Sequence, residues 1–352
     1  MTIYIVTIIL IIIFQPFLQL IFGSEKYKNI YVFIIGTWLF FILALRSETV
    51  GSDLPTYINR YPIFGETPWK ELPEVSKKMD MEMGYAILSK LLYLLSANPR
   101  VLICVVSFII IYVFSKEIKD NSKNPAFSYF LYITLGMYVR TFTAYRQQIA
   151  TALAIFSYRY IREKKPIKFL IVILIASTIH KSVLFVLPMY FIANMKINYK
   201  VYVSSFIGCI LCITIGDRLL SYITYKDRYT EMVARGSDGA VGSCIIFSAF
   251  IVLMIIIWKS FRTPESKFYM HFAIFCLLIS SLTFVLPIIA RMLYYFDAVM
   301  LYTIPNTVSQ IKNISTRYFI ICSICFITLF YYIYIICQAD TGSVIPYSFY
   351  WA

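Results

Sequence analysis

A series of twelve apolar segments, joined by polar stretches, is the feature that most limits what this chain can fold into. Of its 352 residues, 60% are apolar and only 14% are charged. A globular domain is about half apolar and a quarter charged. The sequence therefore predicts an all-α, polytopic integral membrane protein with about 12 transmembrane helices of about 20 residues each, in a single transmembrane domain over residues 1–352. The apolar segments lie near residues 3–22, 30–45, 101–115, 126–139, 148–161, 167–179, 183–193, 201–216, 244–258, 268–286, 292–306 and 318–337.

The formal net charge of +14 does not point to a nucleic acid, because the basic residues lie in short loops between apolar segments. One alternating set of loops carries sixteen Lys and Arg residues against five acidic residues, while the opposite set is nearly balanced. The positive-inside rule places the basic set in the cytoplasm and both termini outside. The basic loops are 23–29, 116–125, 162–168, 194–200, 259–267 and 307–317.

Two long extracytoplasmic loops, residues 46–100 and 217–243, follow from this topology. Within the first, residues 81–96 are apolar but contain Glu82 and Lys90. We interpret this stretch as an amphipathic helix in the outer membrane interface. The topology requires that residues 81–96 do not cross the membrane, because one more crossing would place every later loop on the opposite side.

Two short apolar segments, 167–179 and 183–193, meet at His180. Each is shorter than the roughly 17 residues that a perpendicular membrane helix needs. We expect two separate segments here, because a single long helix would also reverse all later loops.

The densest polar cluster follows the second apolar segment. Gly51 permits a sharp turn, and Asp53 two residues before Pro55 has the order of a helix cap and first turn. One interpretation is that Asp53 caps a short helix. The other is that Asp53 and Arg46 form part of a site for a polar headgroup linked to a lipid.

A second polar cluster, Arg140 to Gln148, precedes the fifth apolar segment. Arg146 falls in the first turn of the expected helix, where a cation is unfavourable against the positive end of the helix dipole. This placement calls for an anion, although a side chain reaching toward lipid phosphate would also explain it.

Further candidates lie at the same outer edge. His180 is a reasonable base, because imidazole is a common general base in enzymes, although many such histidines are structural. Arg291, near Tyr294, adds another guanidinium, the group that suits a diphosphate. Glu82 and Asp297 are ionisable residues in apolar surroundings, and we expect Asp297 to be the partner of an arginine.

The chain has no Walker A loop, no H-E-x-x-H, no G-x-S-x-G and only two histidines. These absences disfavour ATP-driven transport, zinc proteolysis and serine hydrolysis. We expect no metal and no cofactor.

These clusters, in this order, resemble the EpsG family of Wzy-type polysaccharide polymerases, which make O-antigen or capsule. In the first loop the family usually has Thr beside the Asp, whereas this chain has Ser52 and Leu54, and the carboxylate is kept. The resemblance rests on Arg46, Gly51, Asp53 and Tyr57, on Glu82, Gly84 and Tyr85, on Tyr145, Arg146 and Gln147, on His180 and Ser182, and on Arg291 and Tyr294.

The resemblance implies a membrane glycosyltransferase of GT-C-like architecture. It would polymerise oligosaccharide repeat units, both donor and acceptor, carried on undecaprenyl diphosphate at the outer face of the bacterial cytoplasmic membrane. A flippase and a chain-length regulator of the same pathway are implied partners. We expect an inverting, metal-independent transfer in which Asp53 or His180 is the base and Glu82 orients a sugar or an arginine. The expected substrate-binding residues are Arg46, Arg140, Arg146, Gln147, Arg291, Tyr57 and Tyr294.

Two alternatives keep the location and change the reaction. A flippase or transporter of the lipid-linked saccharide would need a charged cavity that reaches both faces. A membrane O-acyltransferase with His180 as base would need a cytoplasmic route for acyl-coenzyme A, yet all six cytoplasmic loops are about 11 residues or shorter.

Overall fold

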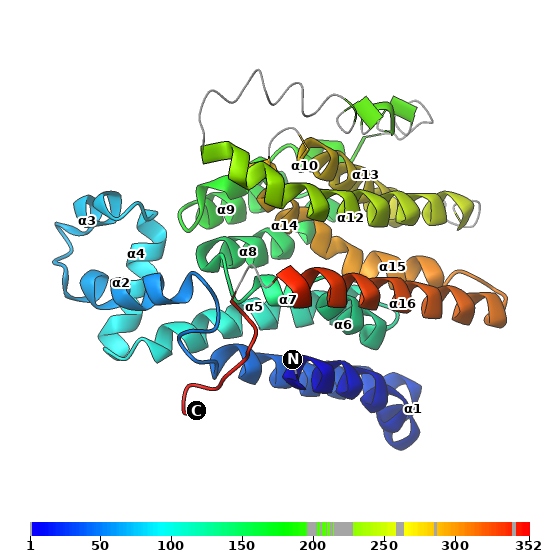
Figure 1. Ribbon diagram of the computed structural model, residues 1–352, viewed down its shortest axis with the longest axis horizontal. Coiled ribbons are helices and arrows are strands. Elements are labelled where there is room, and N and C mark those ends of the chain that lie inside the picture. The colour runs from blue at the N-terminus through cyan, green and yellow to red at the C-terminus, as the bar shows by residue number, and fades with distance from the viewer. Residues whose placement is uncertain are drawn as a thin grey trace.

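The computed structural model describes residues 2–195, 203–204, 206–208, 210–211, 214, 228–257, 264–284, 287–339 and 343–352. Within these residues the regular elements are helices, apart from one isolated β-bridge between Arg46 and Phe349, so the predicted all-α class is confirmed (Figure 1). The helices are α1 (Thr2–Ala44), α2 (Leu54–Glu66), α3 (Leu72–Lys78), α4 (Met83–Leu95), α5 (Arg100–Asn121), α6 (Pro125–Thr134), α7 (Met137–Arg140), α8 (Tyr145–Arg162), α9 (Pro166–Ser177), α10 (Met189–Ile192), α12 (Arg228–Ile257), α13 (Pro264–Leu282), α14 (Leu293–Phe296), α15 (Met300–Val308) and α16 (Ile314–Ala339), with 3-10 turns η1 (Lys181–Val186), η3 (Pro287–Met292) and η4 (Asp297–Val299).

Helix α1 consists of two stretches that fold back on each other. Gly23 has φ 72° and ψ 172°, a backbone conformation open mainly to glycine, and it breaks the helix. Across the hairpin, the Tyr31 hydroxyl donates a hydrogen bond of 2.8 Å to the Ile11 carbonyl. The first two predicted apolar segments are therefore separate helices.

Four helical stretches among the described residues are long and apolar enough to cross a membrane by length and composition. They are Thr2–Gly23, Lys26–Ala44, Arg100–Asn121 and Ile314–Tyr334. Five shorter apolar helices of 10–17 residues accompany them. The chain is a membrane protein, and the number of twelve crossings stays a prediction.

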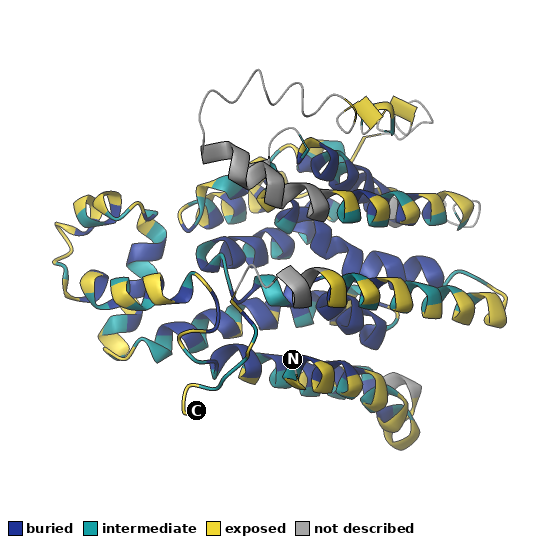
Figure 2. Ribbon diagram, in the orientation of Figure 1, coloured by how far each residue is buried: buried dark blue, intermediate teal, exposed yellow. Residues whose placement is uncertain are grey.

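Several predicted spans are interrupted instead of continuous. The segment 126–139 is split into α6 and α7 by Gly136, which has φ 74°. All residues of α6 and of α15 are buried, and the two helices pack together in the middle of the bundle (Figure 2). Broken helices are tolerated at membrane depth where surrounding protein satisfies the freed backbone groups.

The chain reverses direction at His180, as the sequence predicts. Helix α9 ends before it, and η1 and α10 follow. The Phe169 and Tyr190 rings, near the two ends of this segment, lie 5.4 Å apart between centroids. The segment is thus a hairpin with His180 at its tip.

The first long loop folds into a small unit of three helices, α2 to α4, which stands out at one end of the bundle (left in Figure 1). The Lys90 ammonium donates hydrogen bonds to the carbonyls of Gly65 (2.9 Å) and Thr67 (2.6 Å). These carbonyls lie at the C-terminal end of α2, where the helix dipole stabilises a cation. Helix α4 matches the predicted helix at 81–96. It packs against α2 and α3, and Leu95 is 77% exposed.

The predicted extracytoplasmic loop 217–243 includes the first residues of α12, which begins at Arg228. Residues 217–227 lie outside the described residues, and the side of the membrane stays a prediction. The helix includes several glycines, but a glycine costs a helix only about 1 kcal/mol. Extension of an established helix, packed here against α13, overrides that cost.

Several chain segments meet at the end of the bundle that carries α2 to α4. The Tyr4 hydroxyl donates to the Val344 carbonyl at 3.1 Å, so segments near both termini lie together. Arg100, at the start of α5, donates to the Arg46 carbonyl at 2.8 Å. Gly84, in α4, donates its amide to the Thr178 carbonyl at 2.8 Å, so the hairpin tip near His180 also reaches this end.

Candidate functional site

The first turn of α8 is the point at which the predicted site residues meet. Ala144, just before α8, has the left-handed φ of 50° and ψ of 43°. Its amide donates a hydrogen bond of 2.9 Å to Oδ2 of Asp53. Asp53 is the N-cap residue of α2 but makes no capping hydrogen bond there. It therefore joins the first loop to α8.

Gly51 allows this contact by close approach of two backbones. It has φ +109°, and a Cβ atom at this position would lie 2.2 Å from the Phe142 carbonyl oxygen. A side chain here would force the first loop away from the segment before α8. The sharp turn predicted at Gly51 is confirmed.

Glu82 brings two further motifs to the same place. Oε2 of Glu82 accepts a hydrogen bond from Nη1 of Arg146, and Oε1 accepts one of 3.1 Å from the Lys181 amide. Nδ1 of His180 lies 3.2 Å from Oε1. At this distance a protonated imidazole forms an ion pair, although the ring is not aligned for a hydrogen bond.

These contacts decide the charge of Glu82. Burial by itself raises the pKa of Glu82, but His180, the Lys181 amide and Arg146 outweigh burial and lower the pKa from 4.5 to about 2. Glu82 is therefore a carboxylate at neutral pH. It suits an ionic partner better than a proton acceptor.

Arg146 also contacts the first loop. Its Nε lies 3.5 Å from the Tyr57 hydroxyl, and its Nη1 donates to the Asp80 carbonyl at 3.3 Å. The Tyr57 ring packs against Tyr145 at 5.3 Å between centroids. A carboxylate of the protein, Glu82, thus supplies the anion that the position of Arg146 calls for.

Arg140 is paired in the same manner. Its Nη2 lies 2.6 Å from Oδ2 of Asp297, whose side chain is buried. The Arg140 guanidinium also lies over the Tyr294 ring at 4.5 Å. The expectation that Asp297 is the partner of an arginine is confirmed.

Arg291 differs from the other three predicted arginines. Its carbonyl accepts a hydrogen bond of 2.6 Å from Nε2 of Gln147, which fixes the backbone beside α8. Its side chain is exposed, and among the described residues its guanidinium has no hydrogen-bond or ion-pair partner. Arg291 is free to contact an anionic ligand.

Arg46 is fully buried. Its guanidinium lies 4.9 Å from the centroid of the Phe142 ring and 5.7 Å from that of Tyr145. Within the described part of the chain, none of its three side-chain nitrogens has a hydrogen-bond partner. In this conformation a ligand cannot reach Arg46.

Two contacts of this site do not follow from any pattern in the sequence. The Arg100 guanidinium lies 4.5 Å from the centroid of the Tyr350 ring, in addition to its bond with the Arg46 carbonyl. The Ser182 and Tyr295 hydroxyls are 2.7 Å apart and join the His180 hairpin to α14. The signal for Arg100 was its position directly before an apolar segment, on the outer side of the predicted topology.

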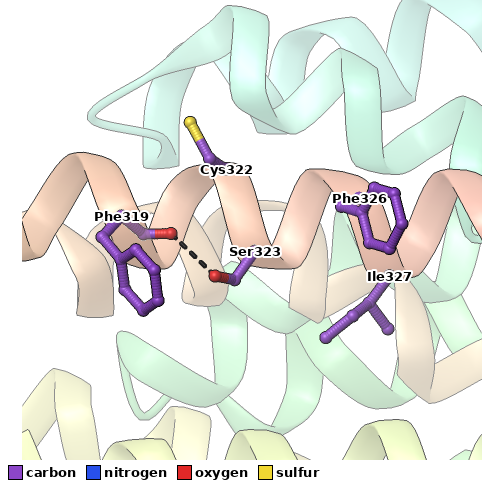
Figure 3. A pocket seen from close by; sticks show the side chains of 5 residues that line it. All are labelled: Phe319, Cys322, Ser323, Phe326 and Ile327. Atoms are coloured by element: carbon purple, nitrogen blue, oxygen red, sulfur yellow. Dashed lines mark hydrogen bonds between the residues drawn. The ribbon is translucent and has the colours of Figure 1, made fainter.

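A hollow on α16 lies away from these groups. It is lined by Phe319, Cys322, Ser323, Phe326 and Ile327, all from one helix (Figure 3). The Ser323 hydroxyl donates to the Phe319 carbonyl at 2.9 Å, so even its polar group is satisfied by the helix. Its lining carries no charge, which suits lipid chains better than a polar substrate.

Together, an ionised carboxylate, an adjacent imidazole and an exposed guanidinium can transfer a proton and bind an anion. Among the described residues, no group of three or more His, Cys, Asp or Glu side chains gathers in a way that could hold a metal ion.

The fold and the site define a class: a helical membrane protein in which arginines, a histidine and carboxylates from distant parts of the chain meet near the start of α8. Residues 29–349 match the family model described as EpsG family, and no curated protein and no solved structure matches the chain. Because the match covers nearly the whole chain, the protein belongs to the EpsG family, a family of Wzy-type polymerase-like proteins. The resemblance noted in the sequence is confirmed.

Proposed function

We propose that the protein is a polysaccharide polymerase. It joins oligosaccharide repeat units carried on undecaprenyl diphosphate into a bacterial surface polysaccharide, at the outer face of the cytoplasmic membrane. The observation that carries the proposal is the cluster of His180, Glu82 and Arg146 in a member of the EpsG family, with the backbone of the exposed Arg291 bonded to the adjacent Gln147.

His180 is the proposed base. It removes the proton from the acceptor hydroxyl as the oxygen attacks the anomeric carbon of the donor sugar. The ionised Glu82, 3.2 Å from Nδ1, stabilises the imidazolium that forms. Asp53 was the other candidate. Because its Oδ2 accepts the Ala144 amide, we assign Asp53 to positioning α8.

The arginines stabilise the leaving group. As the new bond forms, the bond between the anomeric carbon and the diphosphate oxygen breaks, and the electron pair stays on the diphosphate. Guanidinium groups stabilise that developing charge through charge-assisted hydrogen bonds. Arg291 is the accessible ligand, and its backbone is bonded to Gln147, the residue that follows Arg146 on α8. Glu82 holds the Arg146 guanidinium. A single displacement of this kind inverts the anomeric configuration.

The remaining predicted residues support these groups. Arg140 is neutralised by Asp297, and Tyr294 packs on its guanidinium. Gln147 fixes the Arg291 backbone, and Tyr57 packs under the start of α8. We propose that these four residues shape the substrate site.

We propose that the transfer needs no metal. A site for Mg²⁺ or Mn²⁺ usually offers free carboxylate oxygens. Here Glu82, Asp297 and Asp53 are each engaged, by Arg146, Arg140 and the Ala144 amide respectively. Polymerisation should therefore continue in excess EDTA.

The proposed orientation places α2 to α4 and the site outside the cytoplasm. The count of basic residues in the opposite loops supports it. In this orientation the exposed apolar face of α4 lies in the outer interface. A flippase and a chain-length regulator of the same pathway are the proposed partners.

The test is direct synthesis. The protein is purified in detergent, given its undecaprenyl-diphosphate-linked repeat unit, and examined for a ladder of longer products with release of undecaprenyl diphosphate. A ladder that disappears in His180→Ala supports the polymerase. Movement of the lipid-linked saccharide across liposomes without a ladder would instead identify a flippase, and acyl transfer to the glycan would identify an acyltransferase.

A further inference from the structure

The segment 343–352, which we call the C-terminal strap, lies along the end of α1 and the first loop. Its backbone pairs with the chain around Arg46, where the Ser47 amide donates to Ser348 at 2.8 Å and the Tyr350 amide donates to Leu45 at 3.0 Å. These two bonds place Phe349 opposite Arg46 in an antiparallel bridge. The strap thus passes directly beside the buried arginine.

Three further hydrogen bonds hold the strap. The Gly51 amide donates to Ser343 at 3.0 Å, and the Tyr347 hydroxyl donates to the Ile42 carbonyl at 2.8 Å. The third is the bond between Tyr4 and Val344 described above. The strap forms no helix of its own in these residues.

The side chain under the strap is not satisfied. All three guanidinium nitrogens of Arg46 lack a partner within the described residues, and the side chain is 0% exposed. Ring faces of Phe142 and Tyr145 attract the cation, but they do not accept its planar set of hydrogen bonds. A buried charged donor without an acceptor is costly, so this arrangement favours a state in which Arg46 finds an anion.

We propose that the C-terminal strap moves aside during the reaction and lets the diphosphate of the substrate bind Arg46. The proposal rests on the proposed polymerase function and adds a conformational step to it. In the closed state described here, the strap pairs with the backbone at Arg46, and the Arg46 side chain is fully buried. In the open state, Arg46 pairs with diphosphate oxygens in the bidentate geometry that guanidinium favours.

The strap can leave without the unfolding of a helix. Phe142 and Tyr145 are anchored on both sides of Ala144, which is tied to Asp53. The strap, by contrast, contacts the bundle on one side, and Trp351 is 60% exposed. Its release breaks the hydrogen bonds named above and the contact of Tyr350 with Arg100, and it exposes the buried Val344, but it unfolds no helix.

A disulfide that locks the strap tests the proposal. Ser47 and Ser348 lie opposite each other and flank the pair of Arg46 and Phe349. Because successive side chains of an extended strand point to opposite sides, cysteines at these positions leave the Arg46 pocket unchanged. The variant is Ser47→Cys with Ser348→Cys, and each single variant under the same oxidant is its matched control.

The oxidised double variant should make polymer about tenfold more slowly or worse, because the binding-competent state becomes scarce, and reductant should restore the rate. Crosslinking is verified by mass spectrometry. A verified crosslink with polymerisation at the wild-type rate overturns the proposal that the strap moves aside during the reaction. A wild-type protein that makes no polymer overturns the proposed function. In that case the accessibility of Arg46 to a chemical reagent still tests whether the strap moves.

The accessibility of Arg46 gives a readout without polymerisation. Phenylglyoxal modifies exposed arginines, and mass spectrometry of the Arg46 peptide follows it in the oxidised and reduced double variant. Arg46 should react only in the reduced protein, and inorganic diphosphate should protect it. Arg317, in the first turn of α16 and outside the proposed site, should react equally in both redox states and with or without diphosphate, so it serves as internal reference. Equal modification of Arg46 in the two redox states overturns the proposal.

Discussion

The carboxylate of Asp53 accepts the backbone amide of Ala144 at 2.9 Å, across 91 residues of sequence. An amide of the protein backbone thus occupies one of the two carboxylate oxygens, Oδ2. This hydrogen bond holds the left-handed Ala144 and, through it, the first turn of α8. The next residues of that turn are Tyr145, Arg146 and Gln147, so a loop contact sets the position of the site.

Asp53→Asn should keep most activity, because its amide oxygen still accepts the Ala144 amide. Asp53→Ala should lower the rate of polymerisation about tenfold, the equivalent of about 1.4 kcal/mol for a lost hydrogen bond to a charged group. Rates of product-ladder formation compare the two variants. If Asn is as damaging as the variants at His180, Asp53 is the base and not a positioning residue.

His180→Ala should reduce the turnover number by about 10²–10⁴, the usual contribution of a general base, with little change in KM. The isosteric His180→Gln should be equally inactive, because it cannot take up a proton. Single-turnover kinetics with the lipid-linked donor separates the two constants. The matched control is Ser182→Ala on the same hairpin, whose hydroxyl contacts only Tyr295 among the described residues. A rise in KM alone would make His180 a binding residue.

Glu82→Gln should destabilise the protein at neutral pH and much less at strongly acid pH. The pKa of Glu82 falls from 4.5 to about 2 on folding, so its stabilising effect is full above 4.5 and is lost as the pH drops from 4.5 toward 2. Thermal unfolding in detergent across this pH range measures the difference in unfolding temperature between the variant and the wild type. The control is Glu74→Gln, an exposed residue of α3. If this difference in unfolding temperature does not become smaller at acid pH, the assignment of Glu82 to an ion pair is contradicted.

The pair of Arg140 and Asp297 should behave as a structural unit. Removal of either partner leaves a buried charge uncompensated and should cost about 3–5 kcal/mol of stability. The double variant Arg140→Met with Asp297→Leu should be more stable than the sum of the single effects implies. A double-mutant cycle of unfolding midpoints measures this coupling. Additive effects would show that the two side chains do not depend on each other.

Arg291→Ala should leave stability unchanged within about 0.5 kcal/mol, because the side chain is exposed and unpaired among the described residues. Its KM for the lipid-linked donor should rise about tenfold through loss of a charge-assisted contact. Lys312→Ala, in the connection between α15 and α16 at the opposite end of the bundle, is the matched control (Figure 1). Unchanged KM in Arg291→Ala would remove it from the diphosphate site.

Local sequence signals predicted several elements well. The turn at Gly51, the reversal at His180 and the helix at residues 83–95 each follow from a short pattern of residue types. The helix over residues 228–243 did not follow from such a pattern, because its glycines have low helix propensity and continuation of α12 outweighs it.

The sequence also predicted residues of the site, but it did not predict which residues they pair with. It identified Arg140 and Arg146 as cations that need anions, but the carboxylates that pair with them lie 157 and 64 residues away. Arg46 looked accessible beside a long loop, yet the strap and two aromatic rings bury it. Each of these outcomes depends on which helix ends pack together.

The sequence by itself determined a helical membrane protein, because long apolar segments satisfy their backbone hydrogen bonds in a bilayer as helices. It also determined which polar residues fall at the ends of those segments. Only the tertiary structure decided which arginine is paired, which is free and which is covered. The reason is physical: pairing of charges is set by distances of a few ångströms between helix ends, and packing of the whole bundle fixes those distances.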